Sequence, residues 1–326
     1  MDARRALAPP AGTTPLVFAH RGSSAVLPEH TVAAYERAVV EGVDGFECDV
    51  RLTRDRQLVC IHDASIARTS NGRGRVTRLT LAELNRHDYS SWHHERVPVA
   101  ARGPDAVRVA TTDDGILTLD RLLTLARGAG RSLRLLIETK HPSRYGGDVE
   151  RQLVDLLARH GLTGGSRTAA EPDVTVIVMS FSIRALRRVR ALAPEIPTVF
   201  LFDIPTPSVW SGRPPDGVDL LGPSIRVVRH CPEVVRRAHG RGVGVLVWTV
   251  NEPADIALVH ALGVDGIVTD RPADVLAALN RPAPTDRGGS ELAAPTRTDS
   301  PDPRDGRLGP CPSTTGVSTT AGSSPG

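Results

Sequence analysis

Three acidic residues occupy positions from which their side chains could share one metal ion. Glu47 and Asp49 are two residues apart within an apolar run, and Glu138 ends a second apolar run. Because side chains alternate between the two faces of a strand, this spacing places Glu47 and Asp49 on one face. Three carboxylates form an all-oxygen set that suits Mg²⁺, Ca²⁺ or Mn²⁺ rather than zinc. We therefore predict one divalent cation as cofactor, Mg²⁺ or Ca²⁺, with Mn²⁺ as a further candidate.

Two histidines and two basic residues stand at comparable positions. His20 and Arg21 directly follow an apolar run, and His62 follows another. Lys140, the single lysine of the chain, lies two residues beyond Glu138. Two histidines beside a metal can supply a general base and a general acid. Arg21 and Lys140 could hold the non-bridging oxygens of a phosphate. Each motif alone is more often structural, so the prediction depends on their common position at the ends of strands.

The elements that would position these residues follow an alternating pattern. Only six residues separate Arg51 from Leu58, and a parallel crossover needs about a dozen. The run Leu58–Ile61 must therefore return antiparallel, as the second arm of a hairpin. The other eight strands predict a (β/α)₈ TIM barrel, with a doubly wound sheet as the alternative. The nine strand candidates are Leu16–Ala19, Gly45–Arg51, Leu58–Ile61, Leu133–Glu138, Thr175–Met179, Thr198–Phe202, Val218–Leu221, Val243–Trp248 and Gly266–Thr269.

Helices are expected between these strands. A hairpin that turns at residues 54–56 would place His62 opposite Cys48, at the level of Glu47 and Asp49. Catalytic groups of TIM barrels lie at the carboxyl ends of the strands, so all of the candidates would meet at one rim. The helix candidates are Pro28–Glu41, Thr80–Arg86, Leu119–Arg127, Asp148–Arg159, Ile183–Leu192, Pro232–Arg241, Pro253–Leu262 and Pro272–Leu279.

Composition divides the chain into a leader, a folded part and a tail. We expect residues 1–14 to be an N-terminal leader, and they lack the apolar segment of a secretory signal. Residues 15–280 would form the barrel, with residues 63–131 as an inserted lobe that caps its mouth. Residues 281–326 are rich in Pro, Gly, Ser, Thr and Asp, and we expect this tail to be disordered.

Bulk properties exclude several classes of protein. The formal charge of +3 is small for 326 residues, which gives no reason to expect nucleic-acid binding. No stretch approaches the roughly 18 apolar residues of a membrane span, so we expect no stable membrane anchor. Four scattered cysteines without metal-ligand spacing favour a cytoplasmic location. The oligomeric state stays open.

These residues resemble the glycerophosphodiester phosphodiesterase family. The similarity begins at HRGSSAVLPEHTVAAYERAVVEGVDGFECDVRLTRDRQLVCIHDASIARTSNG, residues 20–72. It resumes at LLIETKHP (135–142), VMSFS (178–182), VLVWTVNEP (245–253) and GVDGIVTDRPADVL (263–276). The resemblance implies a TIM barrel with an inserted lobe, catalytic His20 and His62, and metal ligands Glu47, Asp49 and Glu138. It also implies phosphate contacts by Arg21 and Lys140.

The implied activity is metal-dependent hydrolysis of small glycerophosphodiesters, within lipid and glycerol metabolism, to sn-glycerol 3-phosphate and an alcohol. Trp248 could line the alcohol side. The sequence departs from the family at His30, where many members have Asn, and at Asp55-Arg56, where members often have Asp-Gly. We interpret His30, His141 and His230 as structural. A lysophospholipase D or phospholipase-C-like activity on membrane lipids is the alternative, and an inactive binding module is less favoured because no ligand or histidine is lost.

Overall fold

A computed structural model describes Leu7 and residues 15–96, 115–163 and 174–281. The expected disordered tail, from residue 282 on, and the expected leader, except Leu7, lie outside the described residues. The middle of the expected lobe, residues 97–114, lies outside them as well.

The described residues contain eight parallel strands in a barrel, as the sequence predicts. Their order is β7-β6-β5-β4-β2-β1-β9-β8, and the isolated parallel bridges Leu221↔Val245 and Ser224↔Trp248 bring β7 and β8 together. This closure excludes the doubly wound alternative. The strands are β1 Leu16–His20, β2 Gly45–Leu52, β4 Leu133–Thr139, β5 Val174–Ser180, β6 Thr198–Phe202, β7 Leu220–Pro223, β8 Leu246–Val247 and β9 Gly266–Thr269.

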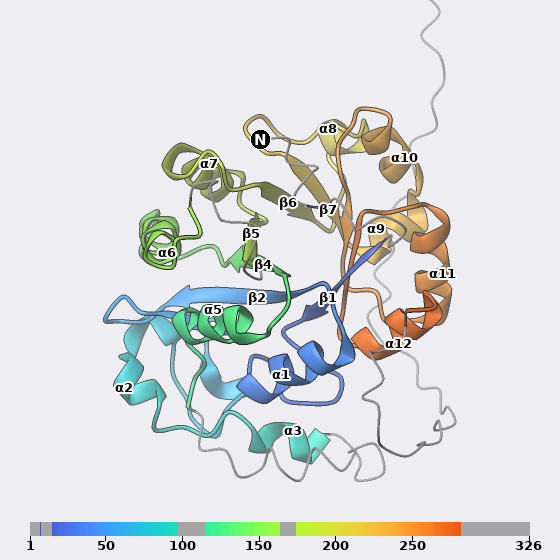
Figure 1. Cartoon of the computed structure of the whole chain (residues 1–326). Coiled ribbons are helices and arrows are strands. Elements are labelled where there is room, and N and C mark those ends of the chain that lie inside the picture. The colour runs from blue at the N-terminus through green and yellow to red at the C-terminus, as the bar shows by residue number, and fades with distance from the viewer. Residues whose placement is uncertain (1–6, 8–14, 97–114, 164–173, 282–326) are drawn as a thin grey trace, which may run out of the picture. The chain divides into compact units, whose positions relative to one another are not determined.

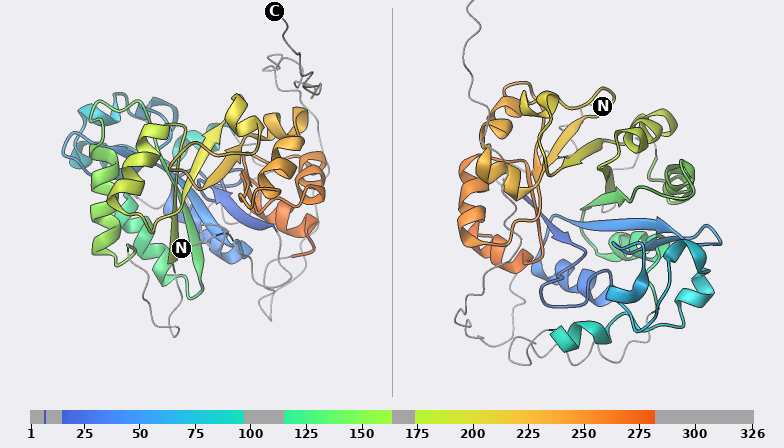
Figure 2. Two further views of the ribbon diagram at one scale, coloured as in Figure 1. Left: turned by 90° about the horizontal axis from the view of Figure 1, so that it is seen from above. Right: turned by 180° about the vertical axis from the view of Figure 1, so that it is seen from behind.

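Most strand residues are apolar because both faces of the sheet are covered. Phe18, Leu136, Ile177 and Val199 belong to a buried cluster inside the barrel, which Leu7 joins. Helices cover the outside of the sheet in all three ribbon views (Figure 1, Figure 2). A sheet with its inner face filled by side chains and its outer face covered by helices leaves the two ends of the barrel as the places for a site.

The expected helices are present with bounds that differ by at most two residues, except at the first helix. Three further helices of the described part of the chain were not predicted: Ser91–Arg96, Pro207–Trp210 and Ile225–His230. Pro28 does not begin a helix: α1 starts at Val32 after the N-cap Thr31, whose side chain accepts a hydrogen bond from Ala34 N. His30 has a positive φ of 58°, which no helix allows. The helices are α1 Val32–Glu41, α5 Leu119–Gly128, α6 Asp148–Arg159, α7 Ile183–Leu192, α8 Pro207–Trp210, α9 Ile225–His230, α10 Glu233–His239, α11 Pro253–Ala261 and α12 Pro272–Ala278.

The short run after β2 forms the antiparallel strand β3 (Leu58–Cys60). Its register pairs Val50 with Cys60 and Leu52 with Leu58, which continues to Cys48 opposite His62 as expected. The turn places Arg56 at a φ of 64°, where glycine is favoured. Side chains offset this strain, since Thr53 Oγ1 donates to Asp55 Oδ1 at 2.6 Å and accepts from Gln57 N at 2.9 Å.

The chain after the hairpin forms a small layer with a core of its own. It contains the 3₁₀ turns Ile66–Arg68 and Val76–Arg78, helix α2 (Leu81–Leu84) and helix α3 (Ser91–Arg96). A capping box of Thr80 and Glu83 starts α2. Figure 1 shows α2 and α3 beside the barrel, outside α1 and α5. The buried cluster beneath it consists of Val59, Ile61, Ile66, Val76, Leu84, Tyr89 and Ile116.

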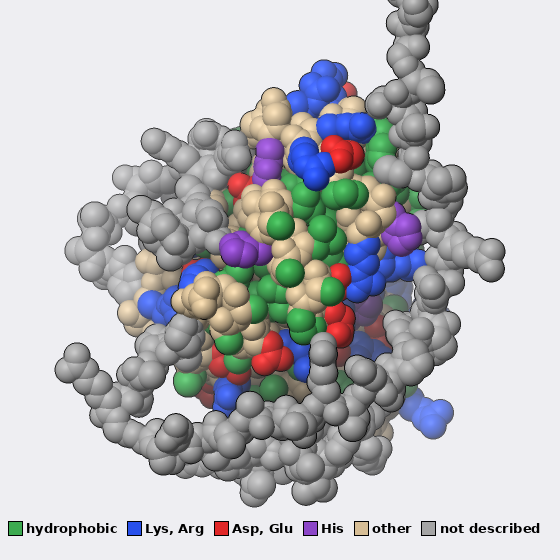
Figure 3. Space-filling view, turned by 90° about the vertical axis from the view of Figure 1, so that its right-hand side faces the viewer, with side chains coloured by type: hydrophobic (Ala, Val, Ile, Leu, Met, Phe, Trp, Pro, Cys, Tyr) green, Lys and Arg blue, Asp and Glu red, His purple; other side chains and the backbone are tan. Residues whose placement is uncertain are grey.

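The surface carries charges of both signs. Figure 3 shows the face that helices α9–α12 form, where basic, acidic and hydrophobic side chains are interspersed. Among the described residues, no helix combines the length and the apolar character that crossing a bilayer requires.

Candidate active site

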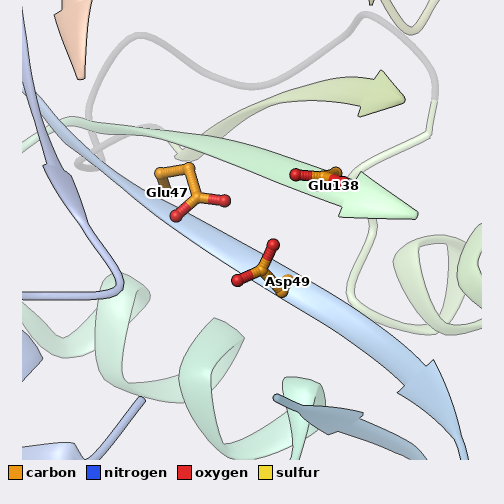
Figure 4. A group of neighbouring side chains, drawn as sticks. All are labelled: Glu47, Asp49 and Glu138. Carbon is orange, nitrogen blue, oxygen red and sulfur yellow. The ribbon is translucent and has the colours of Figure 1, made fainter. Parts of the chain in front are cut away.

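The three carboxylates meet between two neighbouring strands. Glu47 and Asp49 project from one face of β2 toward Glu138 on β4 (Figure 4). The register places Asp49 beside Glu138, and one oxygen of each carboxylate lies within 4.8 Å of the others. All three residues are buried.

Burial and mutual repulsion disfavour the ionised form of these three carboxyl groups unless positive charges compensate them. Burial, together with the charge of Asp49, raises the pKa of Glu47 well above its usual value and the pKa of Glu138 to about 7. Burial opposes the charge of Asp49 too, but Arg21 and Lys140 hold the pKa of Asp49 well below its usual value. A bound cation would favour the ionised form of all three side chains.

The two basic side chains lie against these carboxylates. Lys140 Nζ is 2.8 Å from Asp49 Oδ1 and 2.7 Å from Glu138 Oε1. Arg21 Nε is 2.9 Å from Asp49 Oδ2. Although it is paired with Lys140, the buried Asp49 Oδ1 makes no hydrogen bond of good geometry. An acceptor in that state, next to two further carboxylates, fits the coordination of a hard divalent cation.

His20 lies at the carboxyl end of β1 and is held by an acidic residue. Its Nδ1 donates to Asp270 Oδ1 at 2.6 Å, and its Nε2 is 3.8 Å from Glu47 Oε2. Asp270 also accepts hydrogen bonds from Ser24 Oγ at 2.9 Å and Asn251 Nδ2 at 2.6 Å. Although burial opposes its charge, these donors and His20 keep the pKa of Asp270 below its usual value. The neutral imidazole therefore carries its proton on Nδ1 and its lone pair on Nε2.

His62 has an equivalent arrangement just after the hairpin strand. Its Nδ1 donates to Asp63 Oδ1 at 2.7 Å. Arg51 donates two hydrogen bonds to the backbone oxygen of His62, at 2.9 and 2.7 Å. Burial and the nearby charges of Arg21 and Lys140 outweigh the attraction of Asp49 and lower the pKa of His62 to about 4.

A single cavity joins these groups at one rim of the barrel. Its polar wall consists of His20, Arg21, Glu47, His62, Glu138 and Lys140. The opposite wall is apolar and includes Trp248, Phe181 and Leu201. The Trp248 and Phe181 rings meet edge to face with their centroids 5.4 Å apart, and Trp248 Nε1 donates to Gly222 O at 2.7 Å. A charged wall facing an apolar wall suits a substrate with a phosphate at one end and a less polar group at the other.

The sequence profile of one protein family covers nearly the whole of this barrel. The model of the glycerophosphoryl diester phosphodiesterase family matches residues 20–274. The chain belongs to this family. The family resemblance seen in the sequence is confirmed, and so is the expected enzyme class, a phosphoric diester hydrolase.

Relatives of this phosphodiesterase family match over most of their own length. The chain is 42% identical over 258 residues to the probable glycerophosphodiester phosphodiesterase 1 of Mycobacterium tuberculosis. This match covers 79% of this chain and 90% of that protein. It is 33% identical to the glycerophosphodiester phosphodiesterase of Bacillus subtilis, over 79% of this chain and 84% of that protein.

Solved structures support the fold of the family. A protein from Silicibacter pomeroyi, named as a glycerophosphoryl diester phosphodiesterase, superposes with a TM-score of 0.70 at 26% identity. The superposition covers 86% of this chain and 97% of that one. A phosphodiesterase from Oleispira antarctica, solved in complex with the product sn-glycerol-3-phosphate, gives a TM-score of 0.64 at 24% identity. It covers 82% of this chain and 97% of that chain.

Several residues of the candidate site were not expected from the sequence. His30, interpreted as structural, places its Nε2 3.0 Å from Asp49 Oδ2 and its Nδ1 2.9 Å from the Tyr35 hydroxyl. Asp270 was missed, although it directly follows β9 and the strand-end rule of TIM barrels could have found it. Glu29 and Arg68 were missed too, because they lie in loops for which no rule assigns a position.

Proposed function

We propose that this chain is a metal-dependent phosphodiesterase that hydrolyses glycerophosphodiesters to sn-glycerol 3-phosphate and an alcohol. The observation that carries the proposal is the shared cavity, in which His20 and His62 face the carboxylates Glu47 and Glu138. Membership of the family supports it. The sn-glycerol-3-phosphate bound to the Oleispira antarctica phosphodiesterase supports the choice of product.

Glu47, Asp49 and Glu138 are the residues that would hold the cation. When bound, a divalent ion such as Mg²⁺ or Ca²⁺ would polarise the phosphoryl group and lower the pKa of the attacking oxygen. The carboxylates of β2 and β4 belong to rigid strands, so they fix where the phosphate lies relative to the two imidazoles.

His20 and His62 would exchange the protons of the reaction. The imidazole with an unprotonated Nε2 removes the proton of the attacking oxygen, which belongs to water or to the neighbouring glycerol hydroxyl. The other imidazole, protonated, gives its proton to the departing alcohol. Asp270 and Asp63 bind the two Nδ1 atoms, which keeps each Nε2 as the nitrogen available for this transfer.

Arg21 and Lys140 would bind the non-bridging oxygens of the phosphate. Both side chains lie on the wall of the cavity and contact Asp49. In this position they neutralise the carboxylates and can offer remaining N–H groups to an anionic ligand. Trp248 lies on the opposite wall, where the alcohol would leave.

We test the proposal with glycerophosphocholine and a coupled measurement of sn-glycerol 3-phosphate. The protein is first treated with a chelator and then supplied with Mg²⁺, Ca²⁺ or Mn²⁺ in parallel. We expect product release that depends on added metal and saturates with substrate. Absence of release with all three ions contradicts the proposal.

The exposed rim residues Phe181 and Ile204 favour a lysophospholipase D activity as a second candidate. They follow the neighbouring strands β5 and β6, and 47% and 70% of their surfaces are exposed. Phe181 belongs to the apolar wall of the cavity and reaches solvent, where an acyl chain could lie. Phe181→Ser should then slow choline release from lysophosphatidylcholine but not from glycerophosphocholine. Leu192→Ser is the matched control, because Leu192 is equally exposed at the end of α7.

For the organisation of the chain we propose one catalytic barrel of residues 15–280 with an inserted lobe, and a C-terminal segment outside the catalytic unit. A cytoplasmic location is part of this proposal. It is supported by Cys48 and Cys60, which are buried in the same hairpin without a disulfide.

A further inference from the structure

A chain of ion pairs connects the two sides of the candidate site through the inserted lobe. Arg68, at the end of a 3₁₀ turn of the lobe, binds Glu29 with two nitrogens: Nη1 lies 2.7 Å from Oε2 and Nη2 lies 2.7 Å from Oε1. Its Nε donates to Asp63 Oδ2 at 2.7 Å. Each nitrogen of the Arg68 guanidinium therefore holds one carboxylate oxygen.

Each of these two carboxylates binds a residue of the reaction on its other side. Glu29 Oε1 accepts a hydrogen bond from Arg21 Nη1 at 3.1 Å, and Arg21 in turn contacts the carboxylate Asp49. Asp63 Oδ1 accepts from Nδ1 of His62 at 2.7 Å. A single carboxylate therefore separates Arg68 from Arg21, which would bind the phosphate, and a single carboxylate separates it from His62, which would transfer a proton.

Because Glu29 is largely buried, its negative charge is costly unless basic residues neutralise it. The Glu29 side chain is 11% exposed, and burial disfavours its charge. Arg68 and Arg21 overcome this and lower the pKa of Glu29 to about 2. Without Arg68 the anionic Glu29 would keep Arg21 as its neutralising partner, which would draw the Arg21 guanidinium away from Asp49 and the phosphate.

We propose that Arg68 is a positioning residue of the phosphodiesterase reaction, which holds Arg21 through Glu29 and His62 through Asp63. The inference rests on the proposed function for its kinetic test. Only a planar guanidinium can bind one carboxylate with two parallel hydrogen bonds and a second carboxylate with its third nitrogen. The lobe thereby takes part in the reaction without touching the substrate.

The test compares Arg68→Met and Arg68→Lys with Arg54→Met. Arg54 is the matched control because its guanidinium likewise forms an ion pair between the lobe and another part of the chain, Nη2 to Glu83 Oε1 at 3.2 Å, but reaches neither histidine. Misplacement of a catalytic group can cost up to about 100-fold in rate. We expect kcat with glycerophosphocholine at saturating metal to fall by about 10- to 100-fold in both Arg68 variants, with little change in KM. Arg54→Met should keep the wild-type kcat.

Two further readouts separate positioning from a loss of folding. Added guanidinium ion should restore part of the kcat of Arg68→Ala, whereas it should not affect Arg54→Ala. In protein labelled with ¹⁵N-histidine, the signal of the His62 Nδ1–H bond to Asp63 should be present in the wild type and altered in Arg68→Met. This measurement requires no turnover, so it tests the positioning even if the wild type fails to hydrolyse a glycerophosphodiester.

Three results would overturn the inference. One is a kcat of Arg68→Met within about twofold of that of Arg54→Met, since positioning effects are expected to be larger. Another is a full rate in Arg68→Lys. The third is a loss of rate that guanidinium does not rescue and that leaves the His62 signal unchanged, which would assign Arg68 to folding alone.

Discussion

At the scale of single residues, the site consists of pairs in which one side chain fixes another. His20 is oriented by Asp270, and His62 is oriented by Asp63. The sequence shows which residues can do chemistry, because their types and strand-end positions are unusual. It does not show the partner of His20, because Asp270 lies 250 residues away in the chain and only the closed barrel brings the two together. Asp63, by contrast, directly follows His62 in the sequence.

Loss of either imidazole should abolish most of the turnover. General acid–base catalysis contributes about 10²- to 10⁴-fold, so we expect His20→Ala and His62→Ala to lower kcat by this amount with fresh metal present. His160→Ala is the control, because His160 pairs with Asp120 at the surface, away from the cavity. Near-normal kcat in both site variants would refute the two-histidine mechanism.

The pKa of Glu138 predicts how metal-free protein responds to pH. Its folded-state pKa is raised from 4.5 to about 7. The folded state then holds this proton more tightly than the unfolded state. The associated stability is fully present below pH 4.5 and is lost as the pH rises through about 7. Thermal unfolding in the presence of a chelator, between pH 4.5 and 8, should show this loss in the wild type.

Glu138→Gln should weaken that pH dependence, since the amide does not titrate. Added divalent metal should reverse the loss of stability at high pH, because the ion favours the ionised carboxylates and competes with the proton. The affinity of the protein for the metal should therefore fall as the pH drops below about 7. An equal slope of melting temperature against pH in wild type and Glu138→Gln would show that the carboxyl group is not the cause.

At the scale of elements, the antiparallel pairing of the hairpin β2–β3 was predictable, with strand ends that differ from the expected ones by one residue. The short connection forces an antiparallel return, and the turn position fixes the register that brings His62 level with Cys48. The start of α1 was not predictable in the same way. Pro28 is suited to a first helical position, but the positive φ of His30 delays the helix to Val32. Tertiary contacts of His30 with Asp49 and Tyr35 decide this local conformation.

The N-cap of α1 should therefore matter at Thr31 and not at Pro28. Thr31 accepts a hydrogen bond from Ala34 N at 3.3 Å and donates to Pro28 O at 2.8 Å. Loss of an N-cap side chain costs about 1 kcal/mol, so Thr31→Ala should lower the free energy of unfolding in urea by about this amount. Thr31→Ser keeps the hydroxyl and should remain close to wild type. Equal destabilisation by both variants would show that the lost methyl group, and not the lost hydroxyl, causes the decrease.

At the scale of the whole barrel, the strand order decides where the chemistry lies. The carboxyl ends of β1, β2, β4 and β9 are neighbours in the sheet, and they carry His20, the carboxylates and Asp270. The alternation of strands and helices predicts this convergence from sequence. It says nothing about Glu29 and Arg68, whose positions depend on how loops pack on that rim. The sequence thus predicts the barrel best, the residues at its strand ends less well, and the residues of its loops least.

Arg281, the last residue that the structure describes, is bound to the barrel by its side chain. Arg281 Nη2 donates to Asp44 Oδ1 at 2.8 Å, and Nη1 donates to Pro15 O at 3.1 Å. Asp44 Oδ2 also accepts from Val17 N at 2.7 Å. These bonds fasten the residue that follows α12 and its short connection to the starts of β1 and β2, at the rim opposite the site.

Truncations after residues 281 and 280 should therefore differ in stability but not in chemistry. Residues 1–281 should keep the kcat and melting temperature of the full chain. Residues 1–280 should lose about 1 kcal/mol, because a half-buried charged hydrogen-bond partner of Asp44 is removed. Arg281→Ala in the full chain should reproduce that loss with kcat unchanged. If the 1–281 protein itself loses kcat, the segment beyond Arg281 contributes to catalysis and the proposed organisation of the chain is wrong.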